Sequence, residues 1–149
     1  MNIRRANPKE HEILTDLAVT SESYWGYDKK FLSAFRSIYG LSEDYIMNHP
    51  TFVMEDDDEI IGFYNLIESD EEVTLEYFYI DPVNIRKGYG SQLWEHLVEF
   101  CKNRGILELQ FVSSPEARKF YEKMGAVVVG EADSRVMTDR RILKWKFVV

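Results

Sequence analysis

The sequence predicts an α/β (α+β) fold, with a mixed, mostly antiparallel sheet of about seven strands and helices on its flanks. Runs rich in Val, Ile, Tyr and Phe alternate along the chain with amphipathic segments of helical period. Acidic clusters separate three consecutive strand-like runs near the middle, which is typical of an antiparallel meander. Strand-then-helix units follow in the C-terminal half, and that order requires a parallel crossover.

The first helical patterns lie between the first and second predicted strands. Ile3 to Arg5 form a short strand, and Pro8 opens a helix whose apolar face comprises Ile13, Leu14, Leu17 and Ala18. Asp28 caps a second helix, in which an apolar stripe (Phe31, Phe35, Ile38) ends at Gly40. These helices are expected to flank the sheet.

The meander comprises three β-rich runs, which are Thr51 to Met54, Ile60 to Ile67 and Val73 to Ile80. The acidic clusters Glu55 to Glu59 and Glu68 to Glu72 connect them, because such clusters cannot be buried. A cation site at the first cluster is the alternative, but it lacks the spaced ligands and central Gly of a calcium loop. Hairpin connections are therefore predicted.

The C-terminal half begins with the clearest helix, which starts at Gly88 and ends near Gly105. Cys101 lies on its apolar stripe. The remaining predicted elements are the strand Leu107 to Phe111, a helix from Pro115 to Gly125, and a hairpin whose arms, Ala126 to Val129 and Ile142 to Val149, are joined by Glu131 to Arg140.

Length and composition indicate a single folded domain and exclude several classes of protein. The 149 residues match one globular domain, so a single domain over residues 1–149 is expected. Apolar residues make up 45% of the chain, which is far from the composition of disorder. There is no apolar run long enough to span a bilayer, and Met1 to Glu12 lacks an apolar signal core. We therefore expect a cytoplasmic protein without a membrane partner.

The charged and metal-binding residue types exclude other classes. With 26 acidic and 18 basic residues, the net charge is −8, which argues against a nucleic-acid partner and favours a cationic one. The single Cys101 excludes an intrachain disulfide. The three histidines (His11, His49, His96) lack metal-ligand spacing, so no metal is predicted.

The strongest functional signal is the segment Asp81 to Ser91, which places a glycine-bearing turn between a strand and a helix N-terminus. Unpaired backbone amides of a first helical turn bind anions, and Gly88 and Gly90 have no side chain to block a pyrophosphate. Arg86 and Lys87 add positive charge. The alternative is that the glycines only permit a tight turn and close helix packing.

Two motifs make the chain resemble the GCN5-related N-acetyltransferases, the GNAT family. Ile85-Arg86-Lys87-Gly88-Tyr89-Gly90 is similar to that family's (Q/R)xxGxG signature and follows a strand ending in Phe78-Tyr79-Ile80-Asp81-Pro82. Further along, the segment Ala117 to Ala126 resembles the family's A-x-x-F-Y-E-K-x-G-F helix. The element order fits along nearly the whole chain. Three positions depart from the pattern, and they put coenzyme affinity in doubt: Ile85, Ser114 and Ala126.

The resemblance implies a GNAT-like acyl-CoA N-acyltransferase fold and acetyl-CoA as co-substrate. The strands Val73 to Ile80 and Leu107 to Phe111 would splay apart, the pantetheine arm would lie between them, and the pyrophosphate would lie on the turn. The implied coenzyme-binding residues are Phe78, Tyr79, Ile80, Arg86, Lys87, Gly88, Tyr89, Gly90, Ser91, Ser114 and Tyr121.

Acetyl transfer needs a base for the amine and an acid for the leaving thiolate. Tyr121 aligns with the tyrosine that protonates the sulfur in similar enzymes; the alternative is a core aromatic. Glu76 is the candidate base, because it interrupts an otherwise apolar strand and strand periodicity puts it on the face of Phe78 and Ile80. Its alternatives are a solvated strand position or a base formed by a water chain.

The acceptor is expected to be a small-molecule primary amine, and the acidic balance favours a cationic one. An aromatic-rich segment, Tyr24, Trp25 and Tyr27, is predicted to line its pocket; the alternative is packing of a lid helix on the sheet. The resemblance and the apolar terminal strand Trp145 to Val149 also raise the hypothesis of a homodimer.

The sequence therefore favours an N-acetyltransferase, an acyltransferase that moves groups other than amino-acyl groups. The alternative function is a non-catalytic acetyl-CoA or coenzyme A sensor or interaction module, which the departures at Ile85 and Ser114 allow. A nucleotide-phosphate-binding protein is disfavoured, because the chain lacks both the GxxxxGK(S/T) loop and the GxGxxG spacing.

Overall fold

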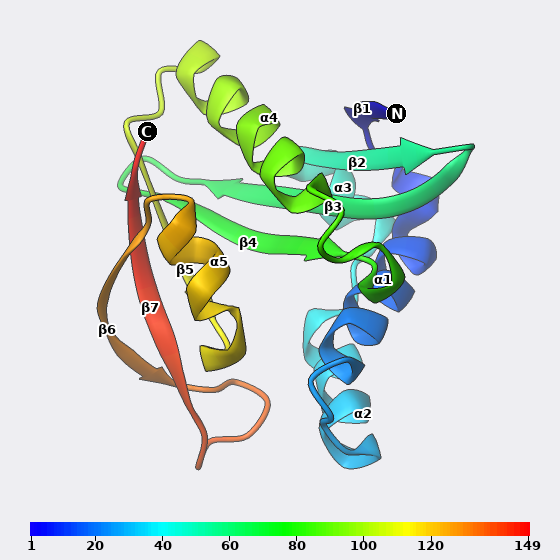
Figure 1. The fold of residues 1–149 in the computed structure, drawn as a ribbon, viewed down its shortest axis with the longest axis vertical. Coiled ribbons are helices and arrows are strands. Elements are labelled where there is room, and N and C mark those ends of the chain that lie inside the picture. The colour runs from blue at the N-terminus through cyan, green and yellow to red at the C-terminus, as the bar shows by residue number, and fades with distance from the viewer.

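A single mixed sheet organises the structure, a computed structural model that describes all residues from 1 to 149 (Figure 1). The strand order is β1-β2-β3-β4-β5-β7-β6, and only β4 and β5 pair in parallel. This confirms the predicted mixed, mostly antiparallel sheet. The strands are β1 (Asn2–Arg5), β2 (Thr51–Asp56), β3 (Glu59–Glu68), β4 (Val73–Ile80), β5 (Glu108–Ser113), β6 (Val127–Asp133) and β7 (Arg141–Val148).

Five α-helices flank the sheet, and three short 3-10 helices lie between the elements. The α-helices are α1 (His11–Ser23), α2 (Lys29–Tyr39), α3 (Glu43–Asn48), α4 (Tyr89–Asn103) and α5 (Arg118–Lys123). The 3-10 helices are η1 (Pro8–Glu10), η2 (Pro82–Asn84) and η3 (Pro115–Ala117). None of the helices is both long and apolar enough to cross a membrane.

The sheet opens between β4 and β5. These strands share one register pair, Thr74 with Gln110, whereas β4 pairs with β3 along the length of β4. In Figure 1, β2, β3 and β4 run across the view while β5 and β7 are steeply inclined to them. The sheet is thus divided into two parts that diverge from one pairing point.

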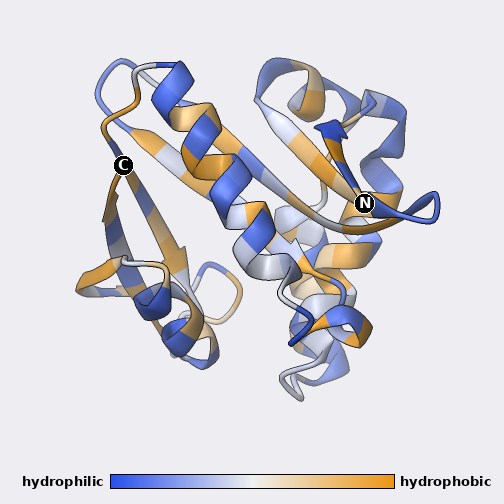
Figure 2. Ribbon diagram, turned by 45° about the horizontal axis from the view of Figure 1, so that its top comes forward, coloured by the Kyte–Doolittle hydropathy of each residue, from blue (hydrophilic) through white to orange (hydrophobic).

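Two hydrophobic cores cover the two faces of the sheet. Alternate residues of β2 and β3 point to opposite faces, so Met54 and Tyr64 pack under α4 while Val53 and Phe63 pack against α1 and α2. Figure 2 shows polar and apolar bands alternating along α4. The buried side chains of α4 are Leu93, Trp94, Leu97 and Cys101, which confirms Cys101 as a core residue.

The structure corrects several details of the predicted elements. Helix α3 was not expected, because its six residues are too few for a periodic pattern; Ser42 caps it by accepting a hydrogen bond from the Tyr45 amide. Ile13 and Ile38 were placed on apolar helix faces, but they are 53% and 45% exposed. Leu107 is also exposed and precedes β5. Ile13 precedes the buried Leu14, Ile38 lies past Phe35, the last buried residue of α2, and Leu107 directly precedes the first residue of β5.

The acidic clusters are hairpin connections, as predicted, but they are shorter than expected. Only Asp57 and Asp58 form the β2–β3 turn, and both have positive φ (49° and 64°). Two positive φ angles are what a tight turn between right-twisted strands requires, and Asp tolerates them. Similarly, Glu131 to Asp133 belong to β6 rather than to the β6–β7 connection.

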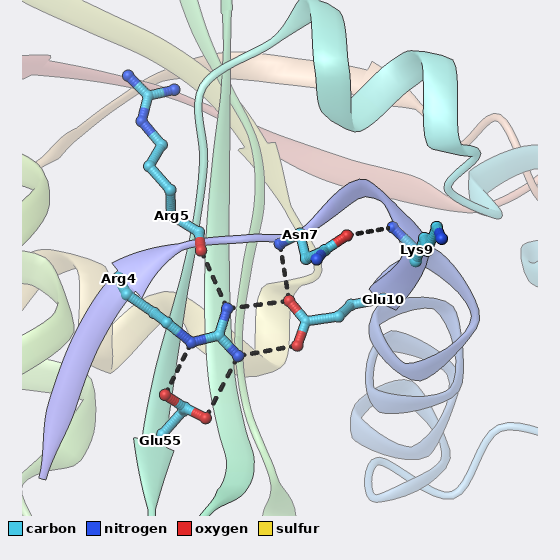
Figure 3. Close-up of polar contacts among 6 residues, drawn as sticks. All are labelled: Arg4, Arg5, Asn7, Lys9, Glu10 and Glu55. Carbon is cyan, nitrogen blue, oxygen red and sulfur yellow. Dashed lines mark hydrogen bonds and ion pairs between the residues drawn. The ribbon is translucent and has the colours of Figure 1, made fainter.

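Arg4 ties β1 to β2 and to the start of α1 (Figure 3). Its guanidinium donates hydrogen bonds to the Glu10 carboxylate at 2.8 and 3.0 Å and to the Glu55 carboxylate at 2.8 and 3.2 Å. Glu10 also accepts a hydrogen bond from the Asn7 amide, completing a capping box. Hydrogen bonding to Arg4 lowers the pKa of Glu10 below its ordinary value.

Arg4→Met should lower the free energy of unfolding by about 1 kcal/mol at pH 7, the scale of a partly exposed ion-pair network. Because the pKa of Glu10 is depressed in the folded state, this contribution is present above the unfolded pKa of about 4.3 and is lost as pH falls through the folded value. Urea denaturation at pH 7 and at low pH measures it. A difference between wild type and variant that persists undiminished at low pH would contradict this account.

Candidate active site

Two cavities meet at the gap between β4 and β5. The coenzyme-side cavity, so named for the motif that borders it, measures about 530 Å³ and extends from the gap to the turn before α4. The opposite cavity measures about 580 Å³ and lies between α2 and the β6–β7 hairpin. Residues common to both linings sit in the gap: Glu22, Leu75, Glu76, Tyr79, Phe111, Val112, Ser113 and Ser114.

The turn before α4 presents free backbone donors to the coenzyme-side cavity. The amides from Arg86 to Ser91 donate no hydrogen bond within the protein, and the first amide used inside the helix is that of Gln92. Arg86 and Gly88 have positive φ (69° and 82°), and a Cβ on Gly88 would meet no atom within 4 Å. Such consecutive free amides at a helix N-terminus form an anion site.

Gly90 has a packing role that the sequence analysis considered only as an alternative. A Cβ built on it would lie 2.9 Å from the Phe120 ring of the α5 region. That ring is held by Phe78, Trp94 and Tyr121, with centroids 5.2 to 6.3 Å away. The missing side chain of Gly90 therefore lets the start of α4 approach α5 closely.

Basic residues of α5 join the turn in lining the coenzyme-side cavity. Lys119 and Lys123 line it together with Arg86. Lys87 and Tyr89, which were predicted as coenzyme-binding, do not: the Lys87 ammonium donates to Asn84 and the Tyr89 hydroxyl to Asp56. Their free amides remain the groups that fit the predicted role. Lys119 and Lys123 were not predicted as coenzyme-binding, although both lie in the segment Ala117 to Ala126.

The edge of β4 that faces the gap is free of strand partners. The Asp81 amide donates to the Ile61 carbonyl, so by alternation the amides and carbonyls of Phe78 and Ile80 point away from β3, toward the gap. The Ile80 carbonyl accepts a hydrogen bond from the Ser21 hydroxyl at 3.2 Å. The predicted backbone edge of Phe78 and Ile80 is thus present and borders the coenzyme-side cavity.

Tyr121 lies beside that edge, inside the aromatic core. Its ring packs on Phe111, Trp94 and Trp145, with centroids 4.8 to 5.9 Å apart. Although the side chain is only 7% exposed, its hydroxyl makes no hydrogen bond within the protein, and the residue lines the coenzyme-side cavity. Burial raises the pKa of Tyr121 above its ordinary value, so the phenol keeps its proton at neutral pH.

Glu76 does not share a face with Phe78 and Ile80, contrary to the expectation from strand periodicity. Tyr77 pairs with Asn65 and Leu75 with Leu66, so Glu76 is the extra residue of a β-bulge. Its carboxylate lies 3.6 Å from the Arg135 guanidinium, which stands over the Tyr39 ring on the α2 side. Glu76 remains at the gap, but with a cation beside it.

The three aromatic residues after α1 that were predicted to line the acceptor pocket lie in two different places. Tyr24 and Trp25 are exposed and line the coenzyme-side cavity, not the opposite one. The Tyr27 hydroxyl donates to Glu116 at 2.9 Å and accepts a hydrogen bond from Arg140. The structure therefore does not gather these three residues into one acceptor pocket.

Glu22, in the last turn of α1, was missed by the sequence analysis. Its carboxylate accepts a hydrogen bond from the Tyr79 hydroxyl at 2.9 Å, and it lines both cavities. Burial raises the pKa of Glu22 above its ordinary value, and the Tyr79 hydrogen bond and the Arg140 charge act against that rise. An acidic residue at the end of a helix gives no signal in sequence that it points inward.

The structure holds no group of His, Cys, Asp and Glu side chains that could bind a metal ion. The groups at the site are free amides, Lys and Arg cations, a protonated phenol and carboxylates, arranged on the two sides of an open sheet.

Comparisons with known proteins agree with this fold and motif set. The model of the acetyltransferase (GNAT) family matches residues 13–126, so the chain belongs to this family of acyltransferases. The 5-NmdU N-acetyltransferase of Pseudomonas phage PaMx11 is 24% identical over 132 residues, which cover 87% of this chain and 89% of that protein.

Solved structures share the fold at low sequence identity. PaiA N-acetyltransferase from Thermoplasma acidophilum, in complex with coenzyme A, superposes with a TM-score of 0.82 at 20% identity, covering 99% of this chain and 98% of that one. The ribosomal-protein-S18-alanine N-acetyltransferase of Escherichia coli gives 0.74 at 15% identity, covering 99% and 93%. The expected GNAT-like fold is confirmed.

Gly90→Ala should lower the free energy of unfolding by about 1–3 kcal/mol, the usual cost of overpacking a fixed aromatic ring. Phe120→Leu in the same chain should recover part of that loss, because it removes the ring atom nearest the added methyl group. A double-mutant cycle by chemical denaturation measures the coupling. Strictly additive effects would show that the ring is not what excludes a side chain at position 90.

Proposed function

We propose that this protein transfers the acetyl group of acetyl-CoA to the primary amine of a small, cationic acceptor. The observation that carries the proposal is the row of free amides from Arg86 to Ser91 at one end of a cavity that Tyr121 also lines. Phosphate binds free helix-terminal amides, and a neutral phenol can protonate a leaving thiolate. The presence of coenzyme A in the PaiA structure supports the same assignment.

Each part of the coenzyme-side cavity has a proposed role. The amides of Arg86 to Ser91, with Arg86, Lys119 and Lys123, hold the phosphates by charge-assisted hydrogen bonds. The free edge of Phe78 and Ile80 pairs with the amides of the pantetheine arm, as an added strand would. Ser114, in the gap, has a hydroxyl free to join these contacts. The thioester then lies near Tyr121, which protonates the sulfur.

The acceptor is proposed to enter through the opposite cavity. Acidic residues lining it outnumber the basic ones, and the overall net charge of −8 steers cations toward the protein. Glu76 and Glu108 already have partners in Arg135 and Lys146. The Glu22 carboxylate lacks an ion-pair partner, which favours an acceptor that carries its own positive charge.

Homodimerisation and a cytoplasmic location remain proposals. Edge strand β6 has exposed Val127 and Val129, and Val148 is exposed on the adjacent β7. An apolar sheet edge of this kind is suited to pairing with a second copy.

Titration calorimetry and thermal shift with acetyl-CoA, coenzyme A, ATP and NAD test the coenzyme. We expect selective binding of acetyl-CoA and coenzyme A, with a rise in melting temperature that grows with ligand concentration. Thiol release with an amine panel then tests catalysis. Binding without thiol release would favour the alternative function, a coenzyme A sensor; preference for ATP or NAD would refute the assignment.

Tyr121→Phe should lower kcat by about 100-fold, because it removes the proton donor to the thiolate. The variant keeps the ring packing, so acetyl-CoA affinity should change little. Steady-state thiol release and calorimetry measure the two quantities. A variant with unchanged kcat would mean that Tyr121 serves only the core.

Lys119→Ala and Lys123→Ala should each weaken acetyl-CoA binding several-fold, about 1 kcal/mol, and reduce its salt dependence. Lys102→Ala is the matched control, because Lys102 is exposed in the last turn of α4 and does not line the cavity. Calorimetric titrations at low and high salt give the comparison. Equal losses in all three variants would point to a general charge effect instead of specific contacts.

A further inference from the structure

Glu22 occupies the point where the two cavities meet, and the catalytic roles described so far do not use it. One carboxylate oxygen accepts the Tyr79 hydroxyl at 2.9 Å, and the other makes no hydrogen bond within the protein. No Lys or Arg nitrogen lies within 4.0 Å of it. A partly buried carboxylate that has one oxygen without a protein partner and no cation within ion-pair distance can bind a positively charged group.

The titratable groups that interact electrostatically with Glu22 come from several elements. Tyr79 belongs to β4, Tyr39 to α2 and Tyr121 to α5, while Glu116 lies in η3 and Arg140 in the β6–β7 connection. The three phenols are neutral at pH 7, because burial raises the pKa of each.

Arg140 is the cation facing this site, and it is engaged elsewhere. Its guanidinium lies 3.3 Å from the Glu116 carboxylate, donates to the Tyr27 hydroxyl, and stacks over the Tyr27 ring. Its positive charge therefore acts to lower the pKa of Glu22 from a distance, without forming an ion pair with it. The Glu22 carboxylate is thus left without an ion-pair partner on the wall of both cavities, where an incoming cation can reach it.

We propose that Glu22 binds the ammonium group of the acceptor and accepts the proton that must leave before the nitrogen attacks. The inference rests on the proposed function and assigns the base of that reaction. An alkylamine is protonated at pH 7, and only its neutral form is nucleophilic. A carboxylate in a low-dielectric pocket attracts the cation first and becomes a better proton acceptor than an exposed one.

The proton balance of the transfer is complete with Glu22 and Tyr121. The acceptor ammonium gives its first proton to Glu22, which returns it to solvent. The nitrogen then forms a bond to the acetyl carbon, and the carbon–sulfur bond breaks. In that step the nitrogen also loses a second proton, which passes to solvent. Tyr121 gives its phenolic proton to the sulfur and then takes up a proton from solvent. The products are the amide, coenzyme A as the thiol, and one proton.

Glu22→Gln is the direct test, because glutamine keeps the size and can still accept the Tyr79 hydrogen bond. The measurement is thiol release from acetyl-CoA with spermidine, lysine, 5-NmdU and hydroxylamine as acceptors, across pH 5–9. We expect kcat/KM at pH 7 to fall at least about 100-fold for acceptors that are protonated there, the usual scale for loss of a general base. Acetyl-CoA affinity should be retained.

Hydroxylamine distinguishes a catalytic role of Glu22 from a structural one. It is largely neutral at pH 7, so it need not lose a proton before it attacks. Its rate should fall much less in Glu22→Gln than the rates of protonated acceptors. Glu12→Gln is the matched control: Glu12 is exposed on the same helix and lines neither cavity. It should behave like wild type. A melting temperature close to that of wild type shows that Glu22→Gln is folded.

Tyr79→Phe supplies a second readout. The Tyr79 hydrogen bond lowers the pKa of Glu22, so its removal should move the acidic limb of the pH–rate profile to higher pH. A shift in the opposite direction, or no shift, would contradict a titrating Glu22 in this role.

The outcomes distinguish the inference from the function it rests on. Wild-type thiol release that Glu22→Gln retains within about threefold would overturn the inference alone, as would loss of the acidic limb in Glu76→Gln instead. No thiol release by wild type with any acceptor would overturn the proposed function and the inference together.

Discussion

The divergence of β4 from β5 is the constraint on which the site depends. A continuous sheet would have used the backbone groups of Phe78 and Ile80 in strand pairing and would have closed the passage between the two cavities. Because pairing is limited to Thr74 and Gln110, the edge stays free and the gap stays open. The aromatic core around Trp94, Phe111 and Tyr121 holds the two parts of the sheet together where hydrogen bonds do not. Side-chain packing thus replaces the hydrogen-bonded ladder at the gap, where the two cavities share lining residues.

The coenzyme-side cavity and the gap between β4 and β5 differ in the charge of the groups that line them. The coenzyme-side cavity combines the free amides of the turn with Lys119 and Lys123, so it is suited to anions at the end away from the gap. Carboxylates gather at the gap itself, in Glu22 and Glu76. Glu76 is paired with Arg135, whereas Glu22 has no ion-pair partner, and this difference is why we propose Glu22 as the group that meets the acceptor amine.

Patterns that are local in the sequence were sufficient to predict the sheet, the main helices and the turn before α4, whereas Tyr121 was predicted from the resemblance of its segment to a family motif. Hydrophobic period and glycine placement report on those features directly. The face of Glu76 was wrong because a bulge inserts one residue into β4, and alternation cannot be counted across it. Glu22 was missed because the α1 pattern does not show which neighbours a terminal residue meets. The separate positions of Tyr24, Trp25 and Tyr27 were not predicted either, because they depend on packing between segments that are distant in the sequence.

The close approach of Gly90 to the Phe120 ring brings two parts of the candidate site together. Gly90 lies in the row of free amides, and Phe120 precedes Tyr121 on the chain. A side chain at position 90 would push against the Phe120 ring, and that ring packs on Tyr121 with the centroids 5.2 Å apart. One packed group of aromatic side chains therefore lies behind both the free amides and the phenol, so a substitution that displaces the Phe120 ring would displace its neighbour as well.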